Sequence, residues 1–301
     1  MNLNAALVAG ARAKSGALPC ASRRMHADPG QLGRFAVASL HAELVCAPKP
    51  GLVTPFDTGS HEDMDATTFM RSLFALRGYF SAIAEAGAET ATFTRLKQLG
   101  IDAEAAMNRA TGGINTHRGA IFSLGLLVAA AASLRAQGAA LSAEVICHEV
   151  RLRWGAPILA TAERGTGASH GQLAVQRYGV GGARHEVAEG FPTLRNVAIP
   201  ALRLSLVAGG QPNAVLAQTL MTLVATTEDT NLLHRGGRTG LAYAQREACE
   251  FLRAGGIASS GWEERLARIG REFVARRLSP GGSADLLACA WFLLRVERSD
   301  G

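Results

Sequence analysis

The sequence predicts an all-α fold: a single large multi-helix domain whose glycine-rich connecting loops form the active site. Apolar residues recur at three- and four-residue steps along most of the chain, which is the period of an amphipathic helix. No segment shows the strict alternation that is typical of strands. At 301 residues, 48% of them hydrophobic, the chain is long and apolar enough to bury a large core.

Nine segments carry the helical period, and the loops between them are rich in glycine and charge. The expected helices are residues 32–45, 66–86, 100–110, 117–136, 142–154, 214–226, 241–254, 261–278 and 283–296. Asp65 is expected to cap the second of them. The apolar run 119–134 is shorter than the ~20 residues of a membrane span, so it predicts a buried core helix and no membrane association.

Residues 1–30 are expected to form a poorly ordered N-terminal extension, and residues 31–301 an all-helical catalytic domain. The first 25 residues contain no acidic side chain and no apolar core of the kind that a secretory signal needs, and Met25 is an alternative start. Five scattered cysteines, none in a CxxC spacing, indicate neither a disulfide framework nor a zinc site and favour a cytoplasmic location.

The net charge of +6 and a pI near 9.4 suit a polyanionic ligand, and several connectors could bind one. The connector 111–116 leads into a helix that Asn115 or Thr116 can cap, with His117 and Arg118 beside the exposed amides. Its two glycines are also compatible with a simple helix end and tight turn. No P-loop, dinucleotide-binding, HExxH or GxSxG motif occurs in the chain.

Three further connectors place carboxylates near glycines: 179–192 with Glu186, 228–240 with Asp229, and 279–283 followed by Asp285. Such oxygen ligands suit Mg²⁺, and a carboxylate can also act as a base. The alternative interpretations are purely structural. Glu186 could form surface ion pairs, and Ser283 could cap a helix with Asp285 in its first turn.

These segments together resemble the family of triphosphoribosyl-dephospho-CoA synthases that serve citrate lyase and malonate decarboxylase. The matching stretches occur in family order: Pro48–Val53, Gly59–His61, Asn115–Ile121, Gly182–Arg184 with Glu186, Gly190–Phe191–Pro192, Asp229–Thr230 and Ser279–Asp285. The run from Ser169 to Gln172 is more similar to the malonate decarboxylase branch.

The resemblance implies an ATP-dependent transferase that joins ATP and 3'-dephospho-CoA, with Mg²⁺ as cofactor, and releases adenine. The product would pass to a phosphoribosyl-dephospho-CoA transferase and an acyl-carrier subunit, and a homodimer is compatible with a helical enzyme of this size. The carboxylates implied as catalytic residues or metal ligands are Glu186, Asp229 and Asp285. The residues implied for substrate and phosphate binding are Lys49, His61, Asn115, His117, Arg118, Arg184, Ser279, Gly281 and Gly282.

Two other functions are compatible with parts of the sequence. A magnesium-dependent nucleosidase or ADP-ribosyl hydrolase would use similar carboxylates with water in place of the hydroxyl. A basic helical nucleic-acid-binding protein would explain the charge, but only 6% of the residues are aromatic and no nucleic-acid-binding motif is present.

Overall fold

The computed structural model describes residues 29–162 and 170–300. Within these ranges the chain forms twelve α-helices and no β-strand, which confirms the all-α prediction. The predicted N-terminal extension, residues 1–30, lies outside the described residues except for its last two positions. These two residues, Pro29 and Gly30, already belong to the first helix.

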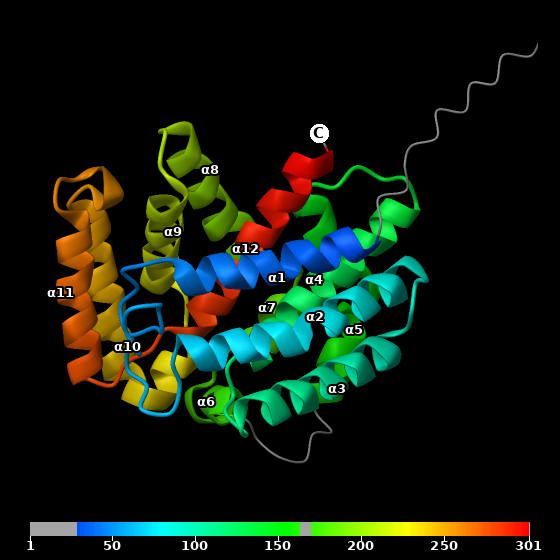
Figure 1. Cartoon of the computed structure of the whole chain (residues 1–301), viewed down its shortest axis with the longest axis horizontal. Helices are drawn as coiled ribbons and strands as arrows, with labels where there is room; N and C mark the ends of the chain where they lie inside the picture. The colour runs from blue at the N-terminus through cyan, green and yellow to red at the C-terminus, as the bar shows by residue number, and fades with distance from the viewer. Residues whose placement is uncertain (1–28, 163–169, 301) are drawn as a thin grey trace, which may run out of the picture.

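Four long helices form the N-terminal half: α1 (Pro29–Val45), α2 (Ala66–Ala88), α3 (Phe93–Thr111) and α4 (Arg118–Ala136). Figure 1 shows α1, α2 and α3 lying side by side along the molecule. Asp65 caps α2, as predicted, by accepting a hydrogen bond from the Thr68 amide. Gly87 lets α2 approach α4 closely, because a Cβ atom there would lie 2.2 Å from the Ala129 carbonyl oxygen.

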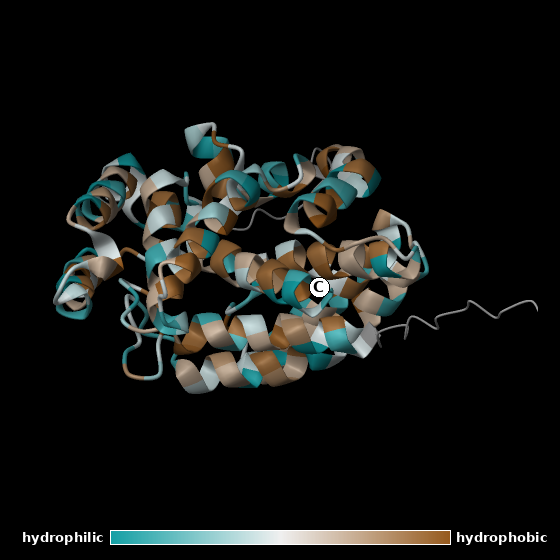
Figure 2. Cartoon of the chain, turned by 90° about the horizontal axis from the view of Figure 1, so that it is seen from above, coloured by the Kyte–Doolittle hydropathy of each residue, from teal (hydrophilic) through white to brown (hydrophobic). Residues whose placement is uncertain are grey.

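Helix α4 is the most deeply buried helix of this half. It is long and apolar enough to cross a membrane, but 78% of its apolar window is buried inside the protein. The prediction of a buried core helix is therefore confirmed. Figure 2 shows the apolar stretches of the helices, in brown, concentrated towards the interior, where they form one continuous core.

The C-terminal half combines three long helices, α5, α10 and α12, with several shorter ones. These helices are α5 (Ala143–Ala162), α6 (His170–Tyr178), α7 (Gly182–Ala188), the π-helical turn η1 (Leu194–Ala198), α8 (Ile199–Val207), α9 (Pro212–Thr226), α10 (Thr230–Arg253), the 3-10 turn η2 (Gly256–Ala258), α11 (Trp262–Ala275) and α12 (Gly281–Asp300). Helix α12 packs against α1, α4 and α9, so it joins the two halves, while α10 and α11 stand at one end (Figure 1).

Two predicted connectors are in fact largely helical. The segment 179–192 contains α7, and the segment 228–240 forms the first part of α10. In the segment 228–240, the predicted break in the helix is limited to Gly237. Its φ of 63° and ψ of −165° kink α10, and the chain is helical on both sides of this residue. Ser283 is also not a helix cap, because α12 begins two residues earlier, and Asp285 lies beyond its first turn.

Candidate active site

The N-termini of α4, α10 and α12 are held together by two aspartates. Asp229 precedes α10 and accepts hydrogen bonds from the Asn231 amide (2.8 Å), from the Ser283 amide (2.8 Å) and from the Ser283 hydroxyl (2.9 Å). Asp285 on α12 accepts a hydrogen bond from the Ala120 amide of α4. Asp229 therefore connects α10 to α12, and Asp285 connects α12 to α4.

This convergence creates a favourable place for an anion. Each helix carries partial positive charge at its N-terminus, where the first amide groups lack partners within the helix. Three such ends in one place add their effects, as in other sites that bind phosphate at a helix N-terminus.

Gly119 makes the junction between α4 and α12 possible. A Cβ atom at this position would lie 2.0 Å from an oxygen of the Asp285 carboxylate, so any side chain would displace it. Gly282 and Gly281 approach the start of α10 in the same manner. A Cβ atom at Gly282 would lie 3.1 Å from an Asp229 carboxylate oxygen, and one at Gly281 would lie 2.8 Å from the side-chain nitrogen of Asn231. The glycines of the predicted site are therefore places of close packing.

The carboxyl group of Asp285 is the most strongly perturbed acid of the site. Burial raises its pKa well above the usual range, and the neighbouring carboxylates of Glu43 and Asp229 raise it further. Burial also raises the pKa of Asp229, although four hydrogen bonds to its two oxygens oppose this shift. An acid with a raised pKa in such a place is suited to proton transfer near neutral pH.

Lys49 forms a buried ion pair with Glu43, whose carboxylate raises the pKa of Asp285. Its ammonium group is 2.5 Å from one Glu43 carboxylate oxygen, and the two side chains are only 1% and 8% exposed. The same ammonium group donates to the Glu43 carbonyl oxygen at 2.5 Å. Gly51 has a φ of 70° and brings this loop against the connection between α11 and α12, since a Cβ atom there would lie 2.2 Å from the Leu278 carbonyl oxygen.

His117 contributes a neutral, buried imidazole at the start of α4. Burial and the charge of Lys49 lower its pKa to about 3, so it is uncharged at neutral pH and can bind phosphate only through a hydrogen bond. Its Nδ1 atom lies 2.7 Å from the Ser72 hydroxyl. Its Nε2 atom and the Thr116 hydroxyl are buried and have no hydrogen-bond partner within residues 29–162 and 170–300, as expected where a ligand supplies the missing contact.

His61 and Ser279 form a second polar group next to α10. Arg235 donates to the Nδ1 atom of His61 at 3.1 Å, so the Nε2 atom carries the proton and donates to the Ser279 hydroxyl at 3.0 Å. Burial and, to a smaller extent, the positive charge of Arg235 lower the pKa of His61 to about 4. The negative charge of Asp63 raises it by less than Arg235 lowers it. His61 therefore acts as a neutral hydrogen-bonding residue.

The side chains of the other predicted residues make separate contacts. Asn115 accepts a hydrogen bond from the Arg118 amide and so helps to cap α4. The Arg118 side chain pairs with Glu104 at 2.9 Å. Glu186 accepts hydrogen bonds from the amide and hydroxyl of Thr193, while Arg184 lines a separate cavity.

Among residues 29–162 and 170–300, no three histidine, cysteine or acidic side chains are grouped closely enough to hold a metal ion. Glu186, Asp229 and Asp285 therefore do not form one metal-binding group. A magnesium ion here would depend on one or two carboxylates and on substrate phosphates, which is how enzymes commonly hold it.

Three residues of the site escaped the sequence analysis. Glu43 lies in a predicted amphipathic helix, where a single acid is normally exposed. Ser72 is a lone hydroxyl in another helix, and Arg235 lies in a segment that was interpreted as a loop. Only the sequence proximity of Glu43 to Lys49, six positions apart, carried a usable signal.

The fold and the site together define an all-α enzyme that handles an anionic substrate. The chain belongs to the ATP:dephospho-CoA triphosphoribosyl transferase family, whose sequence profile matches residues 29–301. No solved structure matches the chain.

Two relatives illustrate the similarity. The 2-(5''-triphosphoribosyl)-3'-dephosphocoenzyme-A synthase of Klebsiella pneumoniae is 39% identical over 263 residues, which cover 85% of this chain and 87% of the relative. A probable synthase of the same name from Acinetobacter calcoaceticus is 39% identical over 267 residues, which cover 89% and 91%. The chain is thus a triphosphoribosyl-dephospho-CoA synthase by family, and the family resemblance noted in the sequence is confirmed.

Proposed function

We propose that the enzyme transfers the triphosphoribosyl group of ATP to the 2'-hydroxyl of 3'-dephospho-CoA and releases adenine. The bond between the ribose C1' atom and adenine breaks, and a bond from C1' to the 2'-oxygen forms. The hydroxyl proton moves to a carboxylate, the departing adenine takes up one proton from water, and the carboxylate then returns its proton to the solvent. The single observation that carries this proposal is the convergence of three helix N-termini on a perturbed carboxylate.

Asp285 is the best candidate for the base. The two oxygens of Asp229 accept four hydrogen bonds, and those of Glu186 are occupied by Thr193. Asp285 instead accepts one, from the Ala120 amide, and its raised pKa makes it a stronger base than an ordinary carboxylate. The negative charges of Asp285, Glu43 and Asp229 also favour the positive charge that develops on the ribose.

The triphosphate is assigned to the helix N-termini and to the buried donors beside them. Lys49 supplies positive charge, and the free ring nitrogen of His117 is available for a hydrogen bond. His61 and Ser279 border the same region. Because the triphosphate remains on the product, these contacts hold the transferred group throughout the reaction.

Magnesium fits this arrangement as a partner of the triphosphate. Among the neighbouring carboxylates, Glu43 has the largest charge effect on the pKa of Asp285. Its second oxygen accepts no hydrogen bond within the described residues. It can supply one ligand, with phosphate oxygens supplying others. Bound magnesium would neutralise part of the phosphate charge. Chelation with EDTA should abolish activity, and added magnesium should restore it.

The product is suited to attachment to an acyl-carrier subunit of malonate decarboxylase or citrate lyase in the cytoplasm, which extends the proposal beyond the reaction itself. Mass spectrometry of the protein incubated with ATP, 3'-dephospho-CoA and magnesium tests the reaction. We expect free adenine and the triphosphoribosyl adduct in equal amounts. Adenine without the adduct would instead identify a hydrolase, and the absence of both would refute the proposal.

A further inference from the structure

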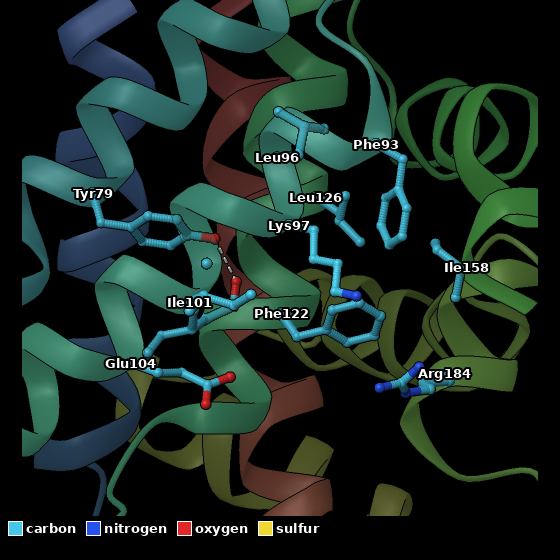
Figure 3. A pocket seen from close by; sticks show the side chains of 12 residues that line it. Tyr79, Phe93, Leu96, Lys97, Ile101, Glu104, Phe122, Leu126, Ile158 and Arg184 are labelled. Atoms are coloured by element: carbon cyan, nitrogen blue, oxygen red, sulfur yellow. Dashed lines mark hydrogen bonds between the residues drawn. The ribbon is translucent and has the colours of Figure 1, made fainter. Parts of the chain in front are cut away.

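A cavity of about 180 Å³ lies beside the first turns of α4, enclosed by α2, α3, α4, α5 and α7. Figure 3 shows the side chains that line it. The walls are mainly apolar, and the rings of Phe93 and Phe122 border the same space. Tyr79 closes one end, with its hydroxyl held by the Ile121 carbonyl oxygen at 2.7 Å. The cavity therefore offers a largely apolar, partly aromatic interior.

Two cations without a partner among the described residues distinguish this cavity from a packing defect. Lys97 and Arg184 line it from α3 and α7, and neither makes a hydrogen bond or ion pair with the described residues. The one acid of the lining, Glu104, is already paired with Arg118. An apolar interior next to two free cations matches a ligand that has both a flat apolar part and a negative charge.

The cavity also adjoins the proposed active site. On the first turn of α4, Gly119 contacts Asp285, whereas Arg118 reaches Glu104 at the border of the cavity. The two sites therefore lie on neighbouring faces of one helical turn. The volume is below the ~300–1,000 Å³ of pockets that enclose whole ligands, so the cavity takes one part of a larger molecule.

We propose that this cavity binds the adenine ring of an adenine nucleotide, with Lys97 and Arg184 binding its phosphates. The proposal rests on the proposed function and assigns a second subsite to it. Aromatic side chains stack on nucleobases, and lysine and arginine bind phosphate oxygens. Both substrates contain adenosine 5'-phosphate, so the nucleotide can come from ATP or from dephospho-CoA.

Gly100 provides a way to fill the cavity without disturbing the fold. It lies inside α3 and lines the cavity, and an added Cβ atom would meet only Ile121, at 3.9 Å. The variant Gly100→Leu should therefore fold and occupy the space. Gly78→Leu is a matched control, because Gly78 also lies inside a helix, is exposed and has nothing within 4 Å of its Cβ position.

The first measurement is calorimetric titration with ADP, which contains the adenine and diphosphate common to both substrates. Gly100→Leu should bind ADP at least about tenfold more weakly than the native protein, and Gly78→Leu should bind it equally well. The double variant Lys97→Gln/Arg184→Gln should weaken ADP binding but leave adenosine binding unchanged. Equal ADP binding by Gly100→Leu and Gly78→Leu would overturn the proposal, as would a native protein that does not bind ADP.

Steady-state kinetics then identify the source of the nucleotide. A higher KM for dephospho-CoA alone in Gly100→Leu would assign the cavity to dephospho-CoA, and a higher KM for ATP alone would assign it to ATP. Unchanged KM values for both would refute the subsite while the proposed reaction stands. Conversely, the expected ADP pattern in a protein that forms no adduct would support the nucleotide site and refute the proposed reaction.

Discussion

At the scale of single residues, the environment of a side chain decides its role more than its chemical type does. Asp229, Asp285 and Glu186 are all partly or fully buried acids with raised pKa values, yet their hydrogen bonds differ. Asp229 and Glu186 are engaged by amides and hydroxyls, whereas Asp285 is held by one amide. Sequence motifs could mark all three acids but could not separate these environments.

Asp285→Asn should separate function from stability. We expect adduct formation to fall by about 10²–10⁴-fold, the usual contribution of a general base. Because the folded-state pKa lies above the unfolded value of about 3.9, the contribution of this acid to stability is complete below about pH 3.9 and is lost as the pH rises towards the folded-state pKa. Removing its charge should therefore raise the free energy of unfolding at pH 7.

Enzyme assays and urea unfolding check this pair of effects together. Asp102→Asn serves as the control, because Asp102 is exposed on α3 and accepts an exposed hydrogen bond from Gln98 of the same helix. It should change neither the activity nor the stability by much. An Asp285→Asn protein that keeps native activity would rule out the assignment of Asp285 as the base.

At the scale of helices, the active site depends on how helices begin. The helical period predicted most segments well, including α4, whose observed start differs from the expected one by a single residue. It failed for 228–240, because glycines and charged residues there suggested a loop. Asp229 in fact starts a helix at once and also holds a second helix that lies 54 positions away, a contact that no local pattern encodes.

Asp229→Ala should destabilise the protein more than the loss of an ordinary helix cap. It removes partners from amides of two helices and leaves buried donors unsatisfied, at a cost of roughly 2–4 kcal/mol. Asp65→Ala removes an exposed cap from α2 alone and should cost less than the loss of Asp229. Urea unfolding measures both losses, and equal losses would show that Asp229 does not join α10 to α12.

At the scale of the whole molecule, the predicted single helical core is confirmed for the described residues, while the position of the polar groups within it was not predictable. His61 and His117 come from segments 56 positions apart; His117 is buried, His61 is partly buried, and both are neutral at pH 7. Burying a neutral imidazole links folding to pH, because acid favours the unfolded chain, in which the ring is free to become charged.

The two histidines should therefore lower the global stability as the pH drops from about 6.5 towards 4, whereas the raised pKa of Asp285 acts in the opposite direction, so the test is the change of slope when the histidines are replaced. The folded-state pKa values of His61 (about 4) and His117 (about 3) lie below the unfolded value of about 6.5, so their contribution is complete above pH 6.5. It is lost as the pH falls, by at most on the order of 3 kcal/mol for His61.

Urea unfolding between pH 7 and pH 5 measures this slope. The double variant His61→Gln/His117→Asn should flatten it, whereas His41→Gln, at an exposed position, should retain it. A double variant with the native slope would mean that other groups control the acid sensitivity of the fold.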